Sequence, residues 1–190
     1  YAMAKEAQIP HINVDLIAGL TGESTQSFSS SVDRIIDLSP DNITVHTFSV
    51  KKAAEIRQEN ASVYDAEGIA AAQAVDYAQA ALTDAGYAPY YMYRQKNTVG
   101  NLENVGFARP GTEGLYNIYM MEEVHSIFAA GASAVSKFVS PMEKDGNCRI
   151  ERIFEAKYPY EYLEAYSESA AQEKMQAYRD FARSFYRENF

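Results

Sequence analysis

Two short apolar segments, separated by an amphipathic one, open the chain. Residues 12–17 are mostly apolar and predict a buried strand, and the β-branched residues 43–48 predict a second strand. Between them Ser24 can cap a helix whose apolar positions recur at helical spacing: Phe28, Val32, Ile35 and Ile36. Strand, helix and strand at this spacing predict a βαβ unit, with parallel strands and a right-handed crossover.

The rest of the chain mixes helical and strand patterns. The Ala-rich residues 66–85 predict a long helix that Gly86 closes, and residues 89–94 and 150–156 predict strands. Several glycines punctuate residues 97–114, which are expected to form loops. After residue 159 the chain is expected to be helical to its end, with one apolar face formed by Tyr178, Phe181 and Phe185.

This order of elements predicts an α/β fold in two parts. Residues 1–62 are expected to close a parallel α/β layer, and residues 63–190 are expected to form an α+β extension. The chain begins at Tyr1 without an initiator Met, in a segment that reads as a helix ended by Pro10. We therefore interpret the chain as a fragment of a longer protein.

Composition narrows the classes of function. The net charge of −9 argues against nucleic acid or an anionic membrane as the main partner, because both need a basic surface. No apolar run approaches the roughly 20 residues that a membrane span needs, and no signal peptide is visible. Cys148 is the single cysteine, so neither a disulfide framework nor a cysteine metal cage is expected. A reducing cytoplasm is the simplest location.

Asp15 is the strongest candidate for a site residue. A carboxylate in an apolar strand is costly to bury without a partner, and ligands bind at the carboxyl ends of parallel strands. Asp15 could hold a ligand hydroxyl or ammonium group, with a capping or salt-bridging role as the alternative. Ser49 follows the second strand and could line the same pocket. His46 could act as an acid or base, although a core histidine is the simpler interpretation.

Other candidates have simpler structural interpretations. The glycines after residue 97 match neither the dinucleotide fingerprint nor a P-loop. Tyrosines such as Tyr91 and Tyr93 could pack against a flat ligand, but core packing is the default. Five cations could bind an anionic substrate, although surface charge explains each of them: Lys51, Lys52, Arg94, Arg109 and Lys137. The residues alone therefore predict a ligand-binding α/β fragment, with no catalytic or metal-ligating residue assigned.

Several motifs resemble those of a known family. The segments NVDLIAGLTGE at residues 13–23 and SPDNITVHT at residues 39–47 resemble the later barrel strands of the oxygen-independent coproporphyrinogen dehydrogenases, which are radical S-adenosylmethionine enzymes. Three later segments resemble the HemZ-type branch: YMYRQKN at 91–97, NVGFARPG at 104–111 and YNIYMMEE at 116–123. The absence of the HNxxYW pattern of other branches favours the same assignment.

The resemblance implies the C-terminal part of a partial parallel (β/α) barrel over residues 1–62, followed by an α+β C-terminal extension over residues 63–190. It implies S-adenosylmethionine and a [4Fe-4S] cluster as cofactors of the parent protein, and a tetrapyrrole substrate whose propionates become vinyl groups on the way to haem. Asp15 falls on the family's Asp that contacts S-adenosylmethionine. Ser49 falls on a small residue that lines the pocket of the same cofactor.

Two departures from the family bear on function. The chain has no cysteine motif for a cluster, so the missing N-terminal half of the polypeptide is expected to supply it and the isolated fragment is expected to be inactive. Thr21 replaces the Pro of the family's GLPG turn. Two alternatives remain open: a haem- or porphyrin-binding carrier of the same family, and an unrelated α/β interaction domain.

Overall fold

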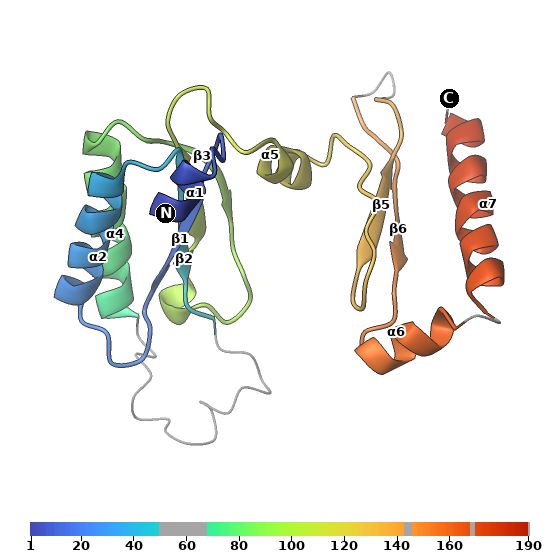
Figure 1. The fold of residues 1–190 in the computed structure, drawn as a ribbon, viewed down its shortest axis with the longest axis horizontal. Helices are drawn as coiled ribbons and strands as arrows, with labels where there is room; N and C mark the ends of the chain where they lie inside the picture. The colour runs from blue at the N-terminus through green and yellow to red at the C-terminus, as the bar shows by residue number, and fades with distance from the viewer. Residues whose placement is uncertain (50–67, 143–145, 168–169, 190) are drawn as a thin grey trace. The chain divides into compact units, whose positions relative to one another are not determined.

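The computed structural model describes residues 1–49, 68–142, 146–167 and 170–189 (Figure 1). They form two compact units, Tyr1–Met121 and Glu122–Phe190. The predicted boundary between residues 62 and 63 lies outside the described residues and stays a prediction. The compact units divide elsewhere because both strands that follow residue 68 in the first unit join the same sheet as the first two strands.

The first unit is built on a mixed four-stranded sheet. Its strands are β1 (Asn13–Ala18), β2 (Asn42–Thr47), β3 (Ala88–Tyr93) and β4 (Asn104–Ala108), in the order β1-β2-β4-β3. β1 and β2 pair in parallel, which confirms the predicted βαβ unit. β4 runs antiparallel to its neighbours β2 and β3.

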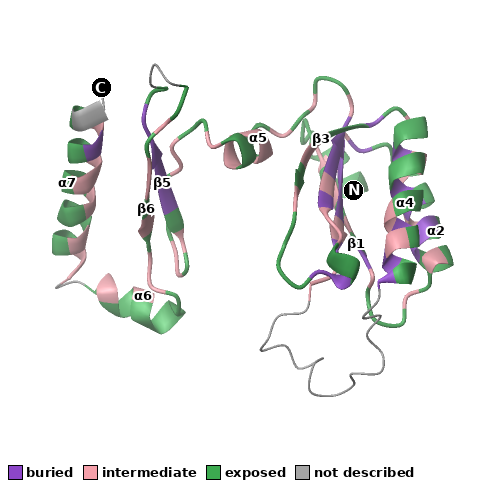
Figure 2. Ribbon diagram, turned by 180° about the vertical axis from the view of Figure 1, so that it is seen from behind, coloured by how far each residue is buried: buried purple, intermediate pink, exposed green. Residues whose placement is uncertain are grey.

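Two helices pack on one face of this sheet. Helices α2 (Thr25–Leu38) and α4 (Ile69–Asp84) lie side by side there (Figure 1). The predicted cap of α2 is present, because the Ser24 side chain accepts the N–H of Ser27 at 3.1 Å. The buried positions of both helices belong to one core with the sheet (Figure 2). That core combines large side chains from α2 and the strands with small ones from α4: Phe28, Val32, Ile43, Val45, Phe107, Ala74 and Ala78.

The expectation of loops over residues 97–114 is wrong in part, because this range contains β4 as well as a short 3-10 helix, η2 (Val99–Asn101). Gly106 lies within β4, where a Cβ atom would come 1.8 Å from Cε1 of Tyr91 in β3. This glycine therefore marks the close approach of a neighbouring ring rather than a turn.

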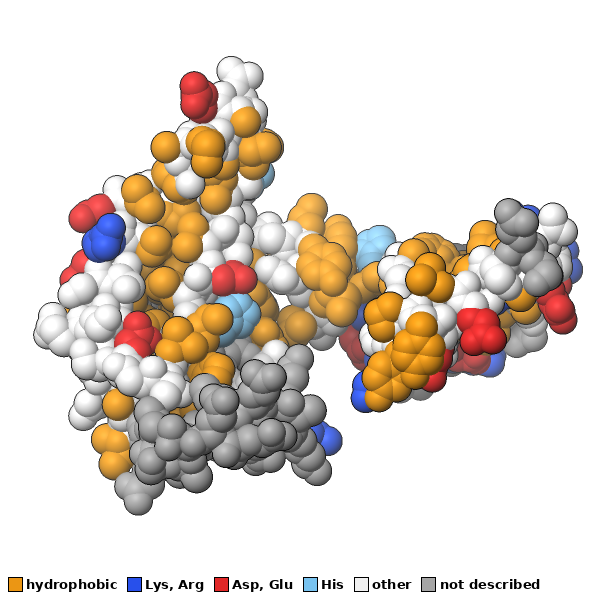
Figure 3. All heavy atoms as spheres, turned by 60° about the horizontal axis from the view of Figure 1, so that its bottom comes forward, with side chains coloured by type: hydrophobic (Ala, Val, Ile, Leu, Met, Phe, Trp, Pro, Cys, Tyr) orange, Lys and Arg blue, Asp and Glu red, His pale blue; other side chains and the backbone are white. Residues whose placement is uncertain are grey.

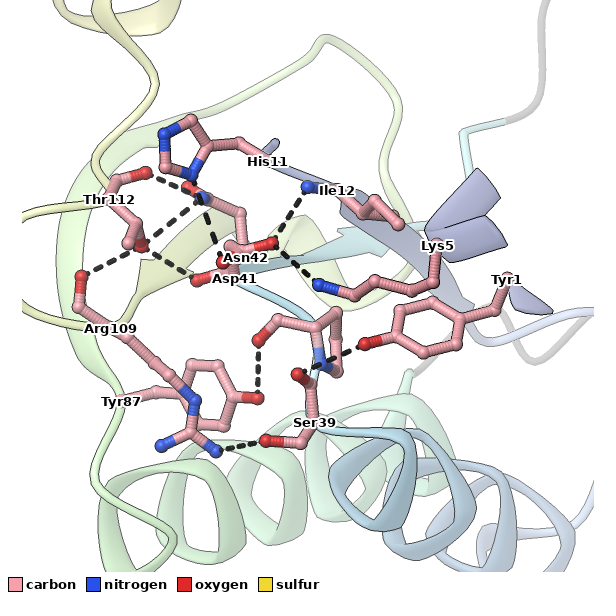
Figure 4. Close-up of polar contacts among 11 residues, drawn as sticks. Tyr1, Lys5, His11, Ile12, Ser39, Asp41, Asn42, Tyr87, Arg109 and Thr112 are labelled. Carbon is pink, nitrogen blue, oxygen red and sulfur yellow. Dashed lines mark hydrogen bonds and ion pairs between the residues drawn. The ribbon is translucent and has the colours of Figure 1, made fainter. Parts of the chain in front are cut away.

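A polar cluster surrounds Asp41 before β2 (Figure 4). The Asp41 carboxylate accepts the backbone N–H of Ile12 at 2.9 Å and lies 3.6 Å from Nζ of Lys5, in the short helix α1 (Ala2–Glu6). His11 Nδ1 lies 3.8 Å from the same carboxylate. The hydrogen bond from Ile12, with the charges of Lys5 and His11, holds the pKa of Asp41 below its ordinary value. Asp41 therefore links the start of the chain to the sheet.

Replacing Asp41 by Asn is expected to lower the free energy of unfolding by about 1–2 kcal/mol at neutral pH, because a charge-assisted hydrogen bond is lost. A folded-state pKa below the unfolded one stabilises the protein above the unfolded pKa, and this contribution is lost as the pH falls through the folded pKa. The difference between the two proteins should therefore vanish in acid. Urea unfolding at several pH values tests this, with the exposed Asp76→Asn as the matched control. A difference that persists in acid would contradict the electrostatic cause.

In the second unit a long helix packs against a β-hairpin. β5 (Val135–Val139) and β6 (Ile150–Phe154) are antiparallel, and α7 (Ala171–Asn189) packs against β5. The predicted aromatic face of α7 is confirmed, because the Phe138 ring lies 5.1 Å from Phe181 and 5.7 Å from Phe185, centroid to centroid. The core of this unit is therefore aromatic.

The expectation of one continuous C-terminal helix is wrong, because α6 (Pro159–Ala165) ends before α7 begins. The Tyr166 hydroxyl donates to Glu155 at 2.8 Å, and Lys174 Nζ donates to the same carboxylate at 2.6 Å. Burial and the Glu155 contact raise the pKa of Tyr166 to about 12. These contacts fix the end of α6 and the first turn of α7 to the end of the hairpin.

The described surface fits the acidic composition. On the face shown in Figure 3, acidic side chains are spread over the molecule and the Lys and Arg side chains lie apart from one another. Among the helices that the structure describes, none is both long and apolar enough to cross a membrane. The helix α5 (Leu115–Glu122) is short and has several exposed apolar side chains.

Candidate functional site

The sheet of the first unit has an apolar face and a polar face. Because side chains alternate along a strand, Leu16 and Ala18 point toward the α2–α4 core, whereas Asp15 points to the opposite face. Asp15 pairs with Thr44 in β2, which pairs with Gly106 in β4. We call this opposite surface the polar face and define it by the side chains of Asn13, Asp15, Ile17, Thr44, His46, Tyr91 and Tyr93.

Asp15 lies on the polar face with its side chain 57% exposed. It is the third residue of β1, so the expectation that it lies at the carboxyl end of the strand is wrong. Asn13 Nδ2 donates to Oδ1 at 2.6 Å, and His46 Nε2 lies 3.4 Å from Oδ2. The carboxylate is thus held from two strands and still open to a ligand.

His46 is not the core histidine that the sequence suggested. It lies on the polar face with its side chain 25% exposed, and its Nδ1 lies 3.4 Å from the Tyr93 hydroxyl. Sequence reasoning missed its link to Asp15 because that link depends on the register, which places Ile17 opposite His46. The alternation of β2 puts His46 on the same face as Thr44, and combining it with the β1 register could have found the pair.

Two tyrosines of β3 complete the polar face. The rings of Tyr91 and Tyr93 stack, with centroids 6.4 Å apart and an interplanar angle of 5°. Burial raises the pKa of both hydroxyls, and the nearby Asp15 carboxylate adds to the effect. Both phenols therefore stay protonated at neutral pH. Tyr91 shares a 3.2 Å hydrogen bond with Thr44, whose hydroxyl lies 3.1 Å from Oδ1 of Asn13.

Ser49 does not contact Asp15. It follows Thr44, the partner of Asp15, by five residues, which at about 3.3 Å per residue corresponds to roughly 16 Å along the strand direction. The Ser49 hydroxyl donates to the carbonyl of Lys96 at 2.9 Å, and its backbone bridges to Thr98. Only an elongated ligand could touch both predicted residues.

The turn after β1 lines a pocket of its own together with α4. Its lining includes Gly19, Thr21 and Glu23 from the turn and Ala71 and Ala74 from α4. Burial raises the pKa of Glu23. This pocket lies past the end of β1 rather than on the polar face.

Three of the predicted cations have structural partners. Arg94 pairs with Glu103 at 2.9 Å, and the Arg109 guanidinium lies 4.4 Å from the centre of the Tyr87 ring. Lys137 is buried and lies 3.5 Å from Glu123. Lys51 and Lys52 lie outside the described residues. These three cations therefore make contacts within the fold, which favours their structural interpretation over an anion-binding one.

The two expected cofactors differ in how well this chain fits them. A [4Fe-4S] cluster is held by cysteine thiolates, and Cys148 is the single cysteine of the sequence, so this chain cannot hold one. S-adenosylmethionine carries a sulfonium and an ammonium group. The accessible Asp15 carboxylate and the Tyr91 and Tyr93 rings of the polar face suit such a cation.

The fold belongs to a known class. It matches the solved structure titled "Coproporphyrinogen III oxidase (HemN) from Escherichia coli is a Radical SAM enzyme", with a TM-score of 0.59 and 19% identity. The match covers 89% of this chain and 37% of that one. The chain therefore has the fold of part of that solved structure, with an α/β architecture.

Sequence comparison gives a more particular relative. The chain is 42% identical over 139 residues to the "Oxygen-independent coproporphyrinogen-III oxidase-like protein HemZ" of Bacillus subtilis (strain 168). No protein-family model matches the chain. The chain is a relative of the HemZ-type proteins, as the motifs suggested, and not an unrelated interaction domain. The match covers 73% of this chain and 28% of that relative, so the chain spans about a quarter of the relative's length.

Proposed function

We propose that the chain is the C-terminal part of a coproporphyrinogen dehydrogenase-like radical S-adenosylmethionine protein, and that its polar face forms part of the S-adenosylmethionine pocket. The observation that carries the proposal is the exposed Asp15 carboxylate, on the sheet face opposite α2 and α4. When helices cover the outer face of a (β/α) barrel, the opposite face lines its interior. The HemZ similarity supports the same assignment.

In this proposal Asp15 accepts hydrogen bonds from a polar or cationic part of S-adenosylmethionine, and Tyr91 and Tyr93 provide an aromatic wall beside it. Ser49 lines a more distant part of the same pocket. Bound together, S-adenosylmethionine and a [4Fe-4S] cluster would supply the radical chemistry that acts on the substrate. The cysteines for that cluster come from the N-terminal half of the polypeptide, because this chain has a single one.

The proposed reaction of the parent protein is the oxidative decarboxylation of propionate side chains on a tetrapyrrole, in haem biosynthesis in the cytoplasm. The HemZ relative is named as an oxygen-independent coproporphyrinogen-III oxidase-like protein, which supports this substrate class. The fragment alone has no cluster and is therefore inactive.

The test uses the full-length protein and this 190-residue chain in parallel. Each is incubated anaerobically with iron, sulfide, a reductant, S-adenosylmethionine and coproporphyrinogen III. The full-length protein is expected to bind a cluster, form 5′-deoxyadenosine and release CO₂, and the fragment to do none of these. Cofactor cleavage by the fragment would contradict the proposal. Tight haem binding by the full-length protein without any turnover would replace it with a carrier function.

A further inference from the structure

We propose that His46 is a positioning residue for Asp15, and that Tyr93 in turn positions His46, so that the carboxylate is held ready for a cationic ligand. This inference rests on the proposed function, in which Asp15 contacts S-adenosylmethionine. It adds two residues, His46 and Tyr93, to the one that the motif pointed to.

The contacts form a chain across the sheet. Asp15 in β1 is held at Oδ1 by Asn13, and its Oδ2 lies 3.4 Å from Nε2 of His46 in β2. The other imidazole nitrogen, Nδ1, lies 3.4 Å from the hydroxyl of Tyr93 in β3. Both distances are at the long end of the range for polar side-chain contacts. Three strands thus fix one carboxylate.

In this proposal the Tyr93 hydroxyl is the donor to His46. Burial and the nearby Asp15 charge raise the pKa of Tyr93, so its hydroxyl keeps its proton. A protonated phenol can donate to Nδ1, and this leaves the imidazole proton on Nε2, which faces Asp15. The same logic orients histidines that are held by a carboxylate or carbonyl beside a metal.

The choice of histidine has a consequence for the ligand. An imidazole with a proton on Nε2 alone can orient a carboxylate without neutralising it. A Lys or Arg in the same place would cancel the charge that attracts a sulfonium or ammonium group. A carboxylate with its charge intact is what a cationic ligand requires.

The test measures the Kd for S-adenosylmethionine and the rate of 5′-deoxyadenosine formation at saturating cofactor, in the full-length, cluster-containing protein. His46→Phe should raise the Kd by about five-fold, because the polar contact with Oδ2 of the carboxylate is lost. His46→Gln should stay within about two-fold of the natural protein, since an amide N–H can still donate to Asp15. Tyr93→Phe should weaken binding by about two- to three-fold. The saturated rate should change less than the Kd.

A double-mutant cycle separates positioning from general damage. In an Asp15→Asn background, His46→Phe should have no further effect on the Kd. His11 provides the matched control, because it also lies beside an aspartate, Asp41, at 3.8 Å. His11→Phe should leave the Kd unchanged, and thermal melting should show that each variant is folded.

The outcomes are distinguishable. If Asp15→Asn leaves the Kd unchanged, the proposed role of Asp15 fails and this inference fails with it. If Asp15→Asn weakens binding but His46→Phe does not, only the inference is overturned. Independent, additive effects of the two substitutions would also overturn it, because a positioning residue acts through the residue that it positions.

Discussion

Replacing Phe138 by Ala is expected to lower the free energy of unfolding of the second unit by about 3–5 kcal/mol, the usual range for truncating a buried aromatic residue. Phe138 is 0% exposed and is the centre of that unit's core. Its ring has neighbours from α7 and from the segment before β5, and the cavity left by its removal would border all of them: Phe128, Tyr178, Phe181, Phe185 and Tyr186.

Hydrogen exchange under increasing urea can measure this loss in β5 and α7 separately from the rest of the chain. The matched control is Phe154→Ala in the paired strand β6, because Phe154 is 71% exposed. Its effect should stay below about 1 kcal/mol. Equal losses for the two variants would mean that Phe138 is not the centre of the core.

Replacing Asp15 by Asn is expected to raise the Kd for S-adenosylmethionine by about 10- to 100-fold in the full-length protein. The substitution keeps the size of the side chain and removes its charge. A hydrogen bond to a charged group contributes about 1.5–3 kcal/mol, which corresponds to this range of Kd. The large exposed fraction of Asp15 means that the folded structure itself should lose little stability.

Isothermal titration under anaerobic conditions gives the Kd, and thermal melting gives the stability. Asp76→Asn on α4 is the matched control, because it removes the same charge from an exposed position on the helical side of the sheet. An unchanged Kd for Asp15→Asn, or an equal loss of affinity for Asp76→Asn, would remove the polar face from the cofactor pocket.

Much of the first half of the fold could be predicted from the sequence. The helical spacing in α2 and the β-branched residues of β2 are local signals, and each element lies where its pattern indicated. The parallel pairing followed from topology alone, because a helix between two strands leaves little alternative. The exposed position of Asp15 was less obvious, since the run around it reads as a fully buried strand.

The features that the sequence did not predict depend on contacts between distant residues. Gly106 was expected to lie in a loop, yet it lies in a strand. The Tyr91 ring of the neighbouring strand leaves no room for a side chain at this position. From the sequence, a core position was the simpler interpretation of His46. The register of β1 against β2 instead places it near Asp15. The break between α6 and α7 has a similar cause, because Tyr166 and Lys174 converge on Glu155 from either side of it.

The position of β1 in the sheet has a practical consequence. In the described sheet β1 is an outer strand, and β2 is its hydrogen-bonding neighbour on one side. The other row of backbone N–H and C=O groups is then a template for strand addition. The chain offers this row to a second copy of itself, and we expect aggregation during purification to begin at β1.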